Sequence, residues 1–305
     1  MDPLTHALSG LTVSFCLPEQ TKRQHIFCLI AASLPDIDNL FFILGKESYL
    51  MYHRGFCHSF FGGLLLAIIL TSLFHLFRNN MKWTSRLYLA YALVCLHLFL
   101  DLITSYGTQL FAPFTSYRCA IPCVFIIDFI LTGFLLICVM MSILAQKHRK
   151  TIARIGLCFI LIYPFFCKMV QFIQLERSKT VLNQNSRAIH VLPGMLAPVY
   201  WKVIIENESC YELRHLSIFS TIQQYPPYTF EKANFNALIS QFPNHSLIKT
   251  YDWFVDYPAQ IKGADCLKVF DLKFISANPR LNRFQNRKHI PFMLCIYPDN
   301  QLKLK

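Results

Sequence analysis

The chain has 305 residues, of which 54% are hydrophobic and only 15% charged. Apolar runs in such a chain must first be compared with the thickness of a bilayer. A net charge of +12 would favour a nucleic-acid partner in a soluble protein. Here much of the charge lies in short loops between apolar runs, and the C-terminal Lys and Arg are dispersed, so we expect a membrane protein without a nucleic-acid ligand.

Six apolar runs are candidates for membrane segments. Four are close to the roughly 20 residues that cross a hydrocarbon core: residues 59–77, 86–104, 124–145 and 155–173. Two weaker runs precede them, the short run 4–17 and the run 26–44, which "SLPDID" interrupts. These two can form either a full hairpin or a re-entrant one, so we expect a polytopic α-helical domain with about four to six segments. The first run has no basic n-region and no small-residue cleavage site, which argues against a signal peptide.

The basic residues of the connections are unevenly divided between the two membrane faces. One face receives nine: Lys22, Arg23, Arg78, Lys82, Arg86, Lys147, Arg149, Lys150 and Arg154. The opposite face receives three: Lys46, Arg54 and Arg118. By the positive-inside rule the first face is cytoplasmic, so both ends of the chain are expected on the non-cytoplasmic side.

The composition changes near Glu176. Beyond it, alternating polar and apolar stretches at residues 200–206, 247–257 and 267–274 predict strands. We therefore expect a helical membrane domain over residues 1–176 and a small β-rich domain outside the membrane over residues 177–305. Cysteines occur without a CxxC pair, and most lie singly in apolar runs, where they act as small hydrophobic residues. No role is assigned to Cys210, Cys266 or Cys295.

Ionisable residues inside membrane segments are costly and need a partner or a cavity. With the expected topology they all fall at one membrane face: His6, Asp36, Asp38, His53, Arg54, His58, His97, Asp101 and Asp128. Ionisable residues without a common role would be scattered over both membrane faces. The convergence predicts one shared polar site.

Local patterns support this site without proving it. His97 and Asp101 are four residues apart and therefore share a helix face, where they can bind an ion or form an intramembrane ion pair. Pro35 disfavours helix at Leu34, so the second run is expected to break and turn Asp36 and Asp38 toward one centre. The alternative at "LPDID" is a solvated helix end.

Imidazole and carboxylate ligands without thiolates suit zinc, manganese or iron. The guanidinium of Arg54 is a planar donor that suits an anionic substrate, although an arginine here can equally reach the lipid headgroups. Together these residue types indicate a divalent metal and an anionic substrate.

Five motifs in order carry a resemblance: "DPLTHALSG", "PDID", "HRGFCHS", "HLFLDLITSYGTQLFAPF" and "FIIDF". They resemble the YdjM-type family of bacterial inner-membrane proteins, described as membrane-bound, metal-dependent hydrolases. The family's HRG stretch usually continues with Thr-His-Ser, and Cys57 here replaces the threonine. More distantly, the His and Asp arrangement is similar to the helical bundles of zinc-dependent phospholipase C and nucleases.

The resemblance implies roles for individual residues. The implied metal ligands are His6, Asp36, His53, His58, His97 and Asp101. Asp38 or Asp128 is then the residue that orients a ligand or acts as base, and Arg54 stabilises negative charge. The expected function is hydrolysis of a phosphoester or similar bond in a membrane lipid or lipid-linked substrate. The alternatives are an ion- or proton-coupled transporter, and a metal-stabilised scaffold whose C-terminal domain binds an envelope protein.

Overall fold

The structure is a computed structural model that describes residues 1–76, 81–181, 186–219, 226–278 and 290–305. Arg78, counted above among the cytoplasmic basic residues, lies outside the described residues. The chain divides into two compact units. The helical unit comprises Met1–Phe41, Tyr52–Lys168 and Met195–Ala197. The C-terminal unit comprises Phe42–Met51, Met169–Gly194 and Pro198–Lys305.

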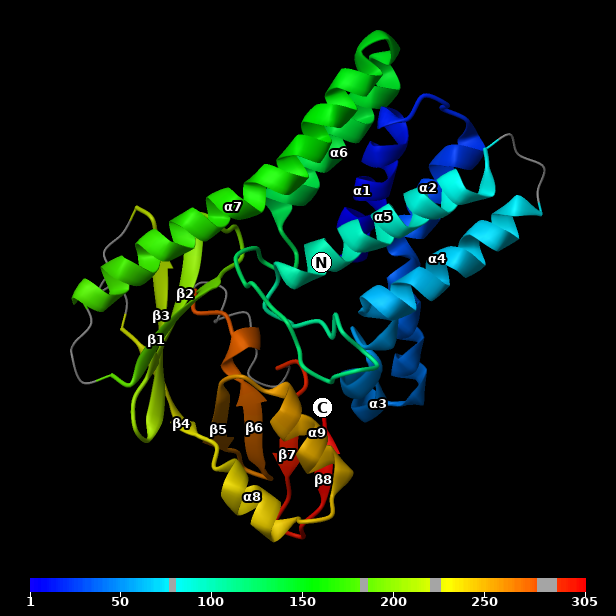
Figure 1. Ribbon diagram of the computed structural model, residues 1–305. Helices are drawn as coiled ribbons and strands as arrows, with labels where there is room; N and C mark the ends of the chain where they lie inside the picture. Colours follow the sequence, from blue (N-terminus) through cyan, green and yellow to red (C-terminus); the bar gives the residue numbers. More distant parts are fainter. Residues whose placement is uncertain (77–80, 182–185, 220–225, 279–289) are drawn as a thin grey trace. The chain divides into compact units, whose positions relative to one another are not determined.

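The longest helices lie within the first 181 residues (Figure 1). The α-helices are α1 (Pro3–Cys16), α2 (Lys22–Ser33), α3 (Lys46–Tyr52), α4 (Phe60–His75), α5 (Trp83–Leu102), α6 (Phe129–Leu144) and α7 (Arg149–Val181). The 3-10 helices are η1 (Leu34–Leu44), η2 (Phe56–His58) and η3 (Gln146–His148). α6 and α7 form a hairpin around η3 (Figure 1), in which the rings of Phe134 and Phe159 contact each other at a tilt of 31°, with centroids 4.1 Å apart.

Three stretches of the described residues are long and apolar enough to cross a membrane: Lys22–Leu44, Trp83–Leu102 and Gln146–Val181. A fourth is added if Lys46–His58 and Phe60–His75, which are bent by 70°, form one span. α6 has 16 residues and α1 has 14, too short for the same test. The expected membrane character is therefore confirmed with three to four apolar helices, whereas the expected count of four to six is not.

The predicted break at Pro35 is present. The α-helix ends at Ser33 and continues as the 3-10 helix η1, because proline lacks the N–H needed for the α-helical ladder.

Before this break, α1 packs closely on α2. A Cβ on Gly10 would lie 2.5 Å from the carbonyl oxygen of Cys28 and 2.7 Å from Cβ of Ala32. Glycine is thus required where the two helices meet.

The C-terminal unit contains an eight-stranded antiparallel sheet in which each strand pairs with the next along the chain. Its strands are β1 (Ala188–Pro193), β2 (Tyr200–Glu206), β3 (Cys210–Ser217), β4 (Tyr228–Lys232), β5 (Pro258–Lys262), β6 (Leu267–Asp271), β7 (Leu294–Ile296) and β8 (Leu302–Leu304). The β-rich character is confirmed, and β2 coincides with the predicted strand 200–206.

Two short helices interrupt this sheet order, α8 (Phe235–Gln241) and α9 (Ser246–Phe254). The predicted strand at 247–257 is therefore wrong. Leu247, Ile248, Tyr251 and Phe254 are all buried, and their spacing of one, three and three residues is that of a helix face. The predicted strand at 267–274 is half right, since β6 ends at Asp271 and η4 (Leu272–Phe274) follows.

A lysine on the sheet is buried. Lys202 on β2 donates from Nζ to the carbonyl oxygens of Leu272, Lys273 and Ile275, at 2.9, 2.7 and 2.9 Å. Desolvation by burial lowers the pKa of Lys202 from 10.5 to about 7. The carboxylate of Asp271 partly opposes this shift. The three carbonyl acceptors match the three N–H groups of the charged ammonium and partly offset the cost of burying it.

Candidate metal centre

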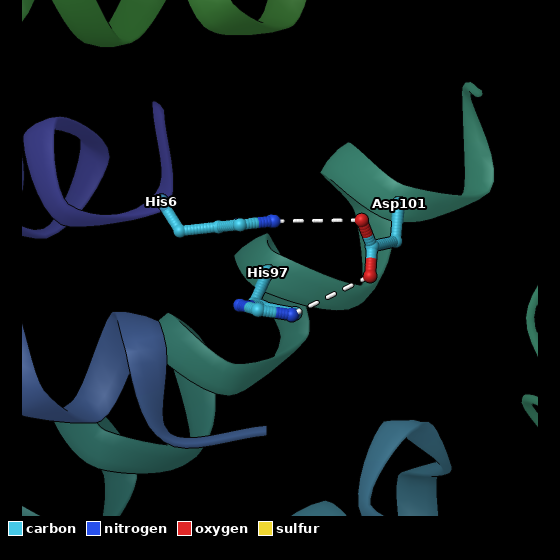
Figure 2. Close-up of side chains that lie close together, drawn as sticks. All are labelled: His6, His97 and Asp101. Atoms are coloured by element: carbon cyan, nitrogen blue, oxygen red, sulfur yellow. Dashed lines mark ion pairs between the residues drawn. The ribbon is translucent and has the colours of Figure 1, made fainter. Parts of the chain in front are cut away.

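The helical unit brings His6, His97 and Asp101 together. His97 and Asp101 project from one face of α5, as their spacing predicts, and His6 reaches the same point from α1 (Figure 2). Nε2 of His6 lies 3.4 Å from Oδ1 of Asp101, and Nε2 of His97 lies 3.5 Å from Oδ2. The rings of His6 and His97 are stacked, with centroids 3.6 Å apart. Asp101 is thus the carboxylate that both imidazoles approach.

The broken second helix and the turn after α3 supply the remaining side chains. Asp38 on η1 accepts three hydrogen bonds: from Nδ1 of His53 at 2.8 Å, from Nδ1 of His58 at 2.8 Å, and from the backbone N–H of Arg54 at 3.0 Å. Asp36, two residues earlier, points Oδ1 to within 3.6 Å of Nε2 of His58. The break at Pro35 therefore turns both carboxylates toward the same centre.

The two central imidazoles have defined tautomers. Nδ1 of His58 faces a carboxylate oxygen of Asp38, and Nδ1 of His97 lies 2.7 Å from the carbonyl oxygen of Ala32. Both partners are acceptors, so each Nδ1 carries the proton and donates it. The lone pairs of the two Nε2 atoms then face each other at 3.1 Å. Two lone pairs at this distance repel unless a cation, a proton or a metal ion, lies between them.

Several other hydrogen-bond acceptors surround the same point. A single proton cannot provide a partner for all of them. The buried ring nitrogens of His6, Oδ2 of Asp36 and Oδ2 of Asp101 have no hydrogen-bond partner among the described residues. Buried polar atoms of native proteins are nearly always paired. The unmatched atoms are nitrogen and carboxylate oxygen, the ligands that zinc, manganese and iron accept.

The ligand atoms lie close enough together to bind an ion. Tetrahedral zinc with Zn–N and Zn–O distances near 2.0–2.1 Å needs donor atoms about 3.3 Å apart. Nε2 of His58 lies 3.1 Å from Nε2 of His97 and 3.2 Å from Oδ2 of Asp101. Oδ1 of Asp36 lies 3.6 and 3.9 Å from the two imidazole nitrogens. Two overlapping groups have ligand atoms close enough to hold an ion: His6, His97 and Asp101, and Asp36, His58 and His97. The cluster can therefore hold a metal ion.

Arg54 is held in a strained conformation beside this cluster. Its φ of 56° lies in the left-handed region, which is uncommon for a residue other than glycine. Its backbone N–H donates to Asp38, and its carbonyl oxygen accepts from the N–H of Gln109 at 2.9 Å. Its guanidinium contacts Oδ1 of Asp101 at 2.8 Å and donates to Oγ1 of Thr104 at 2.9 Å. The charge of Arg54 is therefore fixed at the edge of the cluster.

The cluster is closed on most sides. The side chains of His6, His58, His97 and Asp101 are at most 1% exposed. Asp36 is 16% exposed and His53 9%. The neighbours of Asp36 on η1, Ile37 and Leu40, are exposed apolar side chains. The accessible edge of the centre is thus at Asp36, next to apolar surface.

Two predicted site residues occupy other positions. His53 lies outside both candidate ligand groups and shares Asp38 with His58. Asp128 caps α6, since Oδ1 accepts from the N–H groups of Ile130 and Leu131, at 3.0 and 2.8 Å. Tyr163 also donates to Asp128, at 3.0 Å from Oδ2. Asp128 thus accepts hydrogen bonds from α6 and α7.

Sequence reasoning missed two parts of the site. The carbonyl oxygen of Ala32 sets the tautomer of His97, and no side-chain pattern could reveal a backbone acceptor. Tyr106 lies under Arg54, with the guanidinium carbon 4.9 Å from the ring centroid. An aromatic residue beside a glycine in "TSYGT" is a weak signal, and it is equally typical of an interfacial loop.

Comparison with known proteins agrees with the sequence resemblance. The profile described as YdjM inner membrane protein matches residues 1–175, which include every residue of the cluster. The chain is also 22% identical over 324 residues to the uncharacterized protein YfhP of Bacillus subtilis (strain 168). That alignment covers 100% of this chain and 93% of the relative. No solved structure matches.

Proposed function

Since the chain belongs to the YdjM inner membrane protein family, we propose that it is a membrane-bound, metal-dependent hydrolase of an amphiphilic substrate with a phosphoester bond. The observation that carries the proposal is the pair of Nε2 lone pairs of His58 and His97, 3.1 Å apart and surrounded by unpaired carboxylate oxygens. Such a site is built for a cation.

In this proposal Asp36, His58, His97 and Asp101 bind one divalent ion, zinc before manganese or iron, and His6 is a further ligand. Asp38 orients His58 by accepting its Nδ1 proton, an arrangement that fixes the ring and raises the basicity of the ligand nitrogen. His53 supports Asp38 from the other side. When bound, zinc supplies Lewis acidity to the attacking water and to the phosphoryl oxygen.

The remaining chemistry falls to Arg54. Its guanidinium is held by Asp101 and Thr104 and needs no rearrangement to stabilise negative charge that develops on a phosphoryl oxygen. The exposed edge at Asp36 lies beside Ile37 and Leu40, so an amphiphile can approach with its apolar part against η1. These contacts support a lipid or lipid-linked substrate rather than a small polar ester.

The proposed location is the bacterial inner membrane, crossed several times, with the metal centre and the C-terminal unit on the non-cytoplasmic side. The support is the distribution of Lys and Arg over the connections. Labelling of cysteines introduced at Glu47 and at Lys147 in intact cells tests it. A membrane-impermeant reagent is expected to modify the first position and not the second, and the reverse pattern would contradict the assignment.

Activity is tested with the full-length chain in nanodiscs, stripped of metal and reloaded with zinc, manganese or iron. We expect release of a phosphorylated headgroup from phospholipid, or cleavage of a chromogenic phosphodiester, only with the metal-loaded protein. His58→Ala should abolish turnover, and the matched change His245→Ala in the C-terminal unit should not. Stoichiometric metal without turnover on any phosphoester tested would refute the hydrolase.

One observation favours a second candidate. The imidazoles of His6, His58 and His97 are completely buried, as in a structural metal site. In this alternative the ion only joins α1, η1, η2 and α5, and the C-terminal unit binds another envelope protein. Loss of thermal stability on metal removal, together with the absence of turnover, would favour it.

A further inference from the structure

The segment that follows α5 folds back onto the candidate metal centre. Thr108 and Cys119 exchange two backbone hydrogen bonds, at 2.9 and 2.8 Å, so the two arms of this loop lie side by side at these residues. The N–H of Gln109 donates to the carbonyl oxygen of Arg54 at 2.9 Å. This loop is therefore attached directly to the backbone of a proposed site residue.

Two guanidinium groups share one aromatic ring in this loop. The guanidinium carbons of Arg54 and Arg118 lie 4.9 and 5.2 Å from the ring centroid of Tyr106. Their separation is therefore at most about 10 Å, with both charges attracted by the same ring. Arg118 also donates from Nη2 to the carbonyl oxygen of Tyr106.

The backbone at Gly107 is adapted to this arrangement. Gly107 has a φ of +87°, and a Cβ built there would lie 3.3 Å from Cβ, Nε and Nη2 of Arg118. Any other residue would be strained and would press on the Arg118 side chain. The loop is thus shaped around the position of this guanidinium.

The charges of the site explain what a second arginine adds. With neutral imidazoles, Asp36, Asp38 and Asp101 carry three negative charges, and Arg54 with a divalent ion would carry three positive charges. These charges balance, apart from the amino group of Met1, which also contacts Oδ1 of Asp101. Arg118, half-buried on the loop, adds a positive charge beside this centre.

We propose that Arg118 is a substrate-positioning residue that forms, with Arg54 and the ring of Tyr106, a subsite for a phosphate group. This inference rests on the proposed function and names the group that the centre recognises. Arg54 is fixed by Asp101 and Thr104 and acts at the reacting phosphoryl group. Arg118 acts earlier, on binding, and its planar donors suit two phosphate oxygens at once.

Unpaired donors in the same region support a polar ligand. Nε of Arg54 and Oγ1 of Thr108 are buried and have no hydrogen-bond partner among the described residues. Their residues are neighbours, because Gln109, which follows Thr108, bonds to the carbonyl of Arg54. Water or a phosphate oxygen satisfies such donors, and an apolar ligand does not.

The test is binding of inorganic phosphate to the full-length, metal-loaded protein by calorimetry. The variants are Arg118→Gln, Arg118→Lys and the matched control Arg154→Gln on α7. We expect Arg118→Gln to weaken phosphate binding by at least about tenfold, since it removes a charge-assisted bidentate contact. Arg118→Lys should recover part of the affinity through its charge, and Arg154→Gln should bind like the wild type. Metal content should be unchanged in all three, which shows that the centre is intact.

Nanodiscs of zwitterionic lipid with and without phosphatidate identify the source of the phosphate. Competition by phosphatidate indicates a lipid headgroup, and its absence indicates a soluble phosphate compound. Equal phosphate affinity in the wild type and in Arg118→Gln overturns the subsite and leaves the hydrolase standing. A wild type that binds no phosphate also overturns the subsite. Turnover of the chromogenic phosphodiester tests the hydrolase proposal separately. In that assay Arg118→Gln should raise KM about tenfold with kcat within about twofold.

Discussion

Asp38 does not bind the proposed metal, yet its replacement by asparagine should weaken metal binding. Its carboxylate accepts from Nδ1 of His53, from Nδ1 of His58 and from the N–H of Arg54, at 2.8, 2.8 and 3.0 Å. The change Asp38→Asn keeps the shape and removes the charge. The amide oxygen can still accept hydrogen bonds from His58 and Arg54, but Nδ1 of His53 must then accept a hydrogen bond from the amide nitrogen.

Loss of such a supporting carboxylate typically lowers metal affinity 10- to 100-fold, which corresponds to about 1.4–2.7 kcal/mol. We expect a change in this range for Asp38→Asn, measured by competition with a chromogenic chelator on the detergent-purified chain. Asp252→Asn, on the exposed side of α9, is the matched control and should bind like the wild type. An affinity for Asp38→Asn within twofold of wild type would refute the role assigned to His58, because its orientation would then not depend on Asp38.

Three further predictions concern stability. Gly10→Ala should lower the free energy of unfolding by about 1–3 kcal/mol, because the new Cβ meets the backbone of α2. The control Gly133→Ala, whose new Cβ has nothing within 4 Å, should be neutral or stabilising in the same thermal assay. Equal unfolding midpoints for the two variants would contradict the close packing of α1 and α2. Asp128→Ala should cost about 1 kcal/mol by removing the cap of α6 and leave metal content unchanged, and loss of the metal would instead return Asp128 to the site. Lys202 should make the C-terminal unit more stable as pH rises. Between about pH 8 and 9.5 the unfolded chain holds the proton that the folded state, with a pKa of about 7, has released. The gain approaches about 1.4 kcal/mol per pH unit. It should be absent in Lys202→Met, and an unchanged pH slope in that variant would be the contrary result.

The gathering of the polar residues could be predicted because topology decides which helix ends meet. His6, Asp36, His58 and His97 belong to different segments, yet each falls at the same end of the helical bundle. Pro35 likewise marks the helix break directly, since its missing N–H ends the α-helical ladder. These features depend on residue types and their order along the chain.

Other features depend on tertiary contacts that a single sequence does not display. Residues 247–257 satisfy both a strand and a helix pattern over a short stretch, and burial of Tyr251 and Phe254 decides for the helix. The tautomer of His97 depends on the carbonyl of Ala32, 65 residues away. Asp128 is different, because an aspartate directly before an apolar helix is an N-cap pattern, so its capping bonds have a sequence signal.

The most direct measurement of the central claim is the metal content of the detergent-purified chain by mass spectrometry. Wild type, His58→Ala, His97→Ala and the control His245→Ala are compared after equilibration with zinc, manganese and iron. We expect about one ion per chain in the wild type and in His245→Ala, and its loss from both His58→Ala and His97→Ala. A wild type that binds no ion after reconstitution, or ions retained in both variants, would contradict a shared site at these two imidazoles.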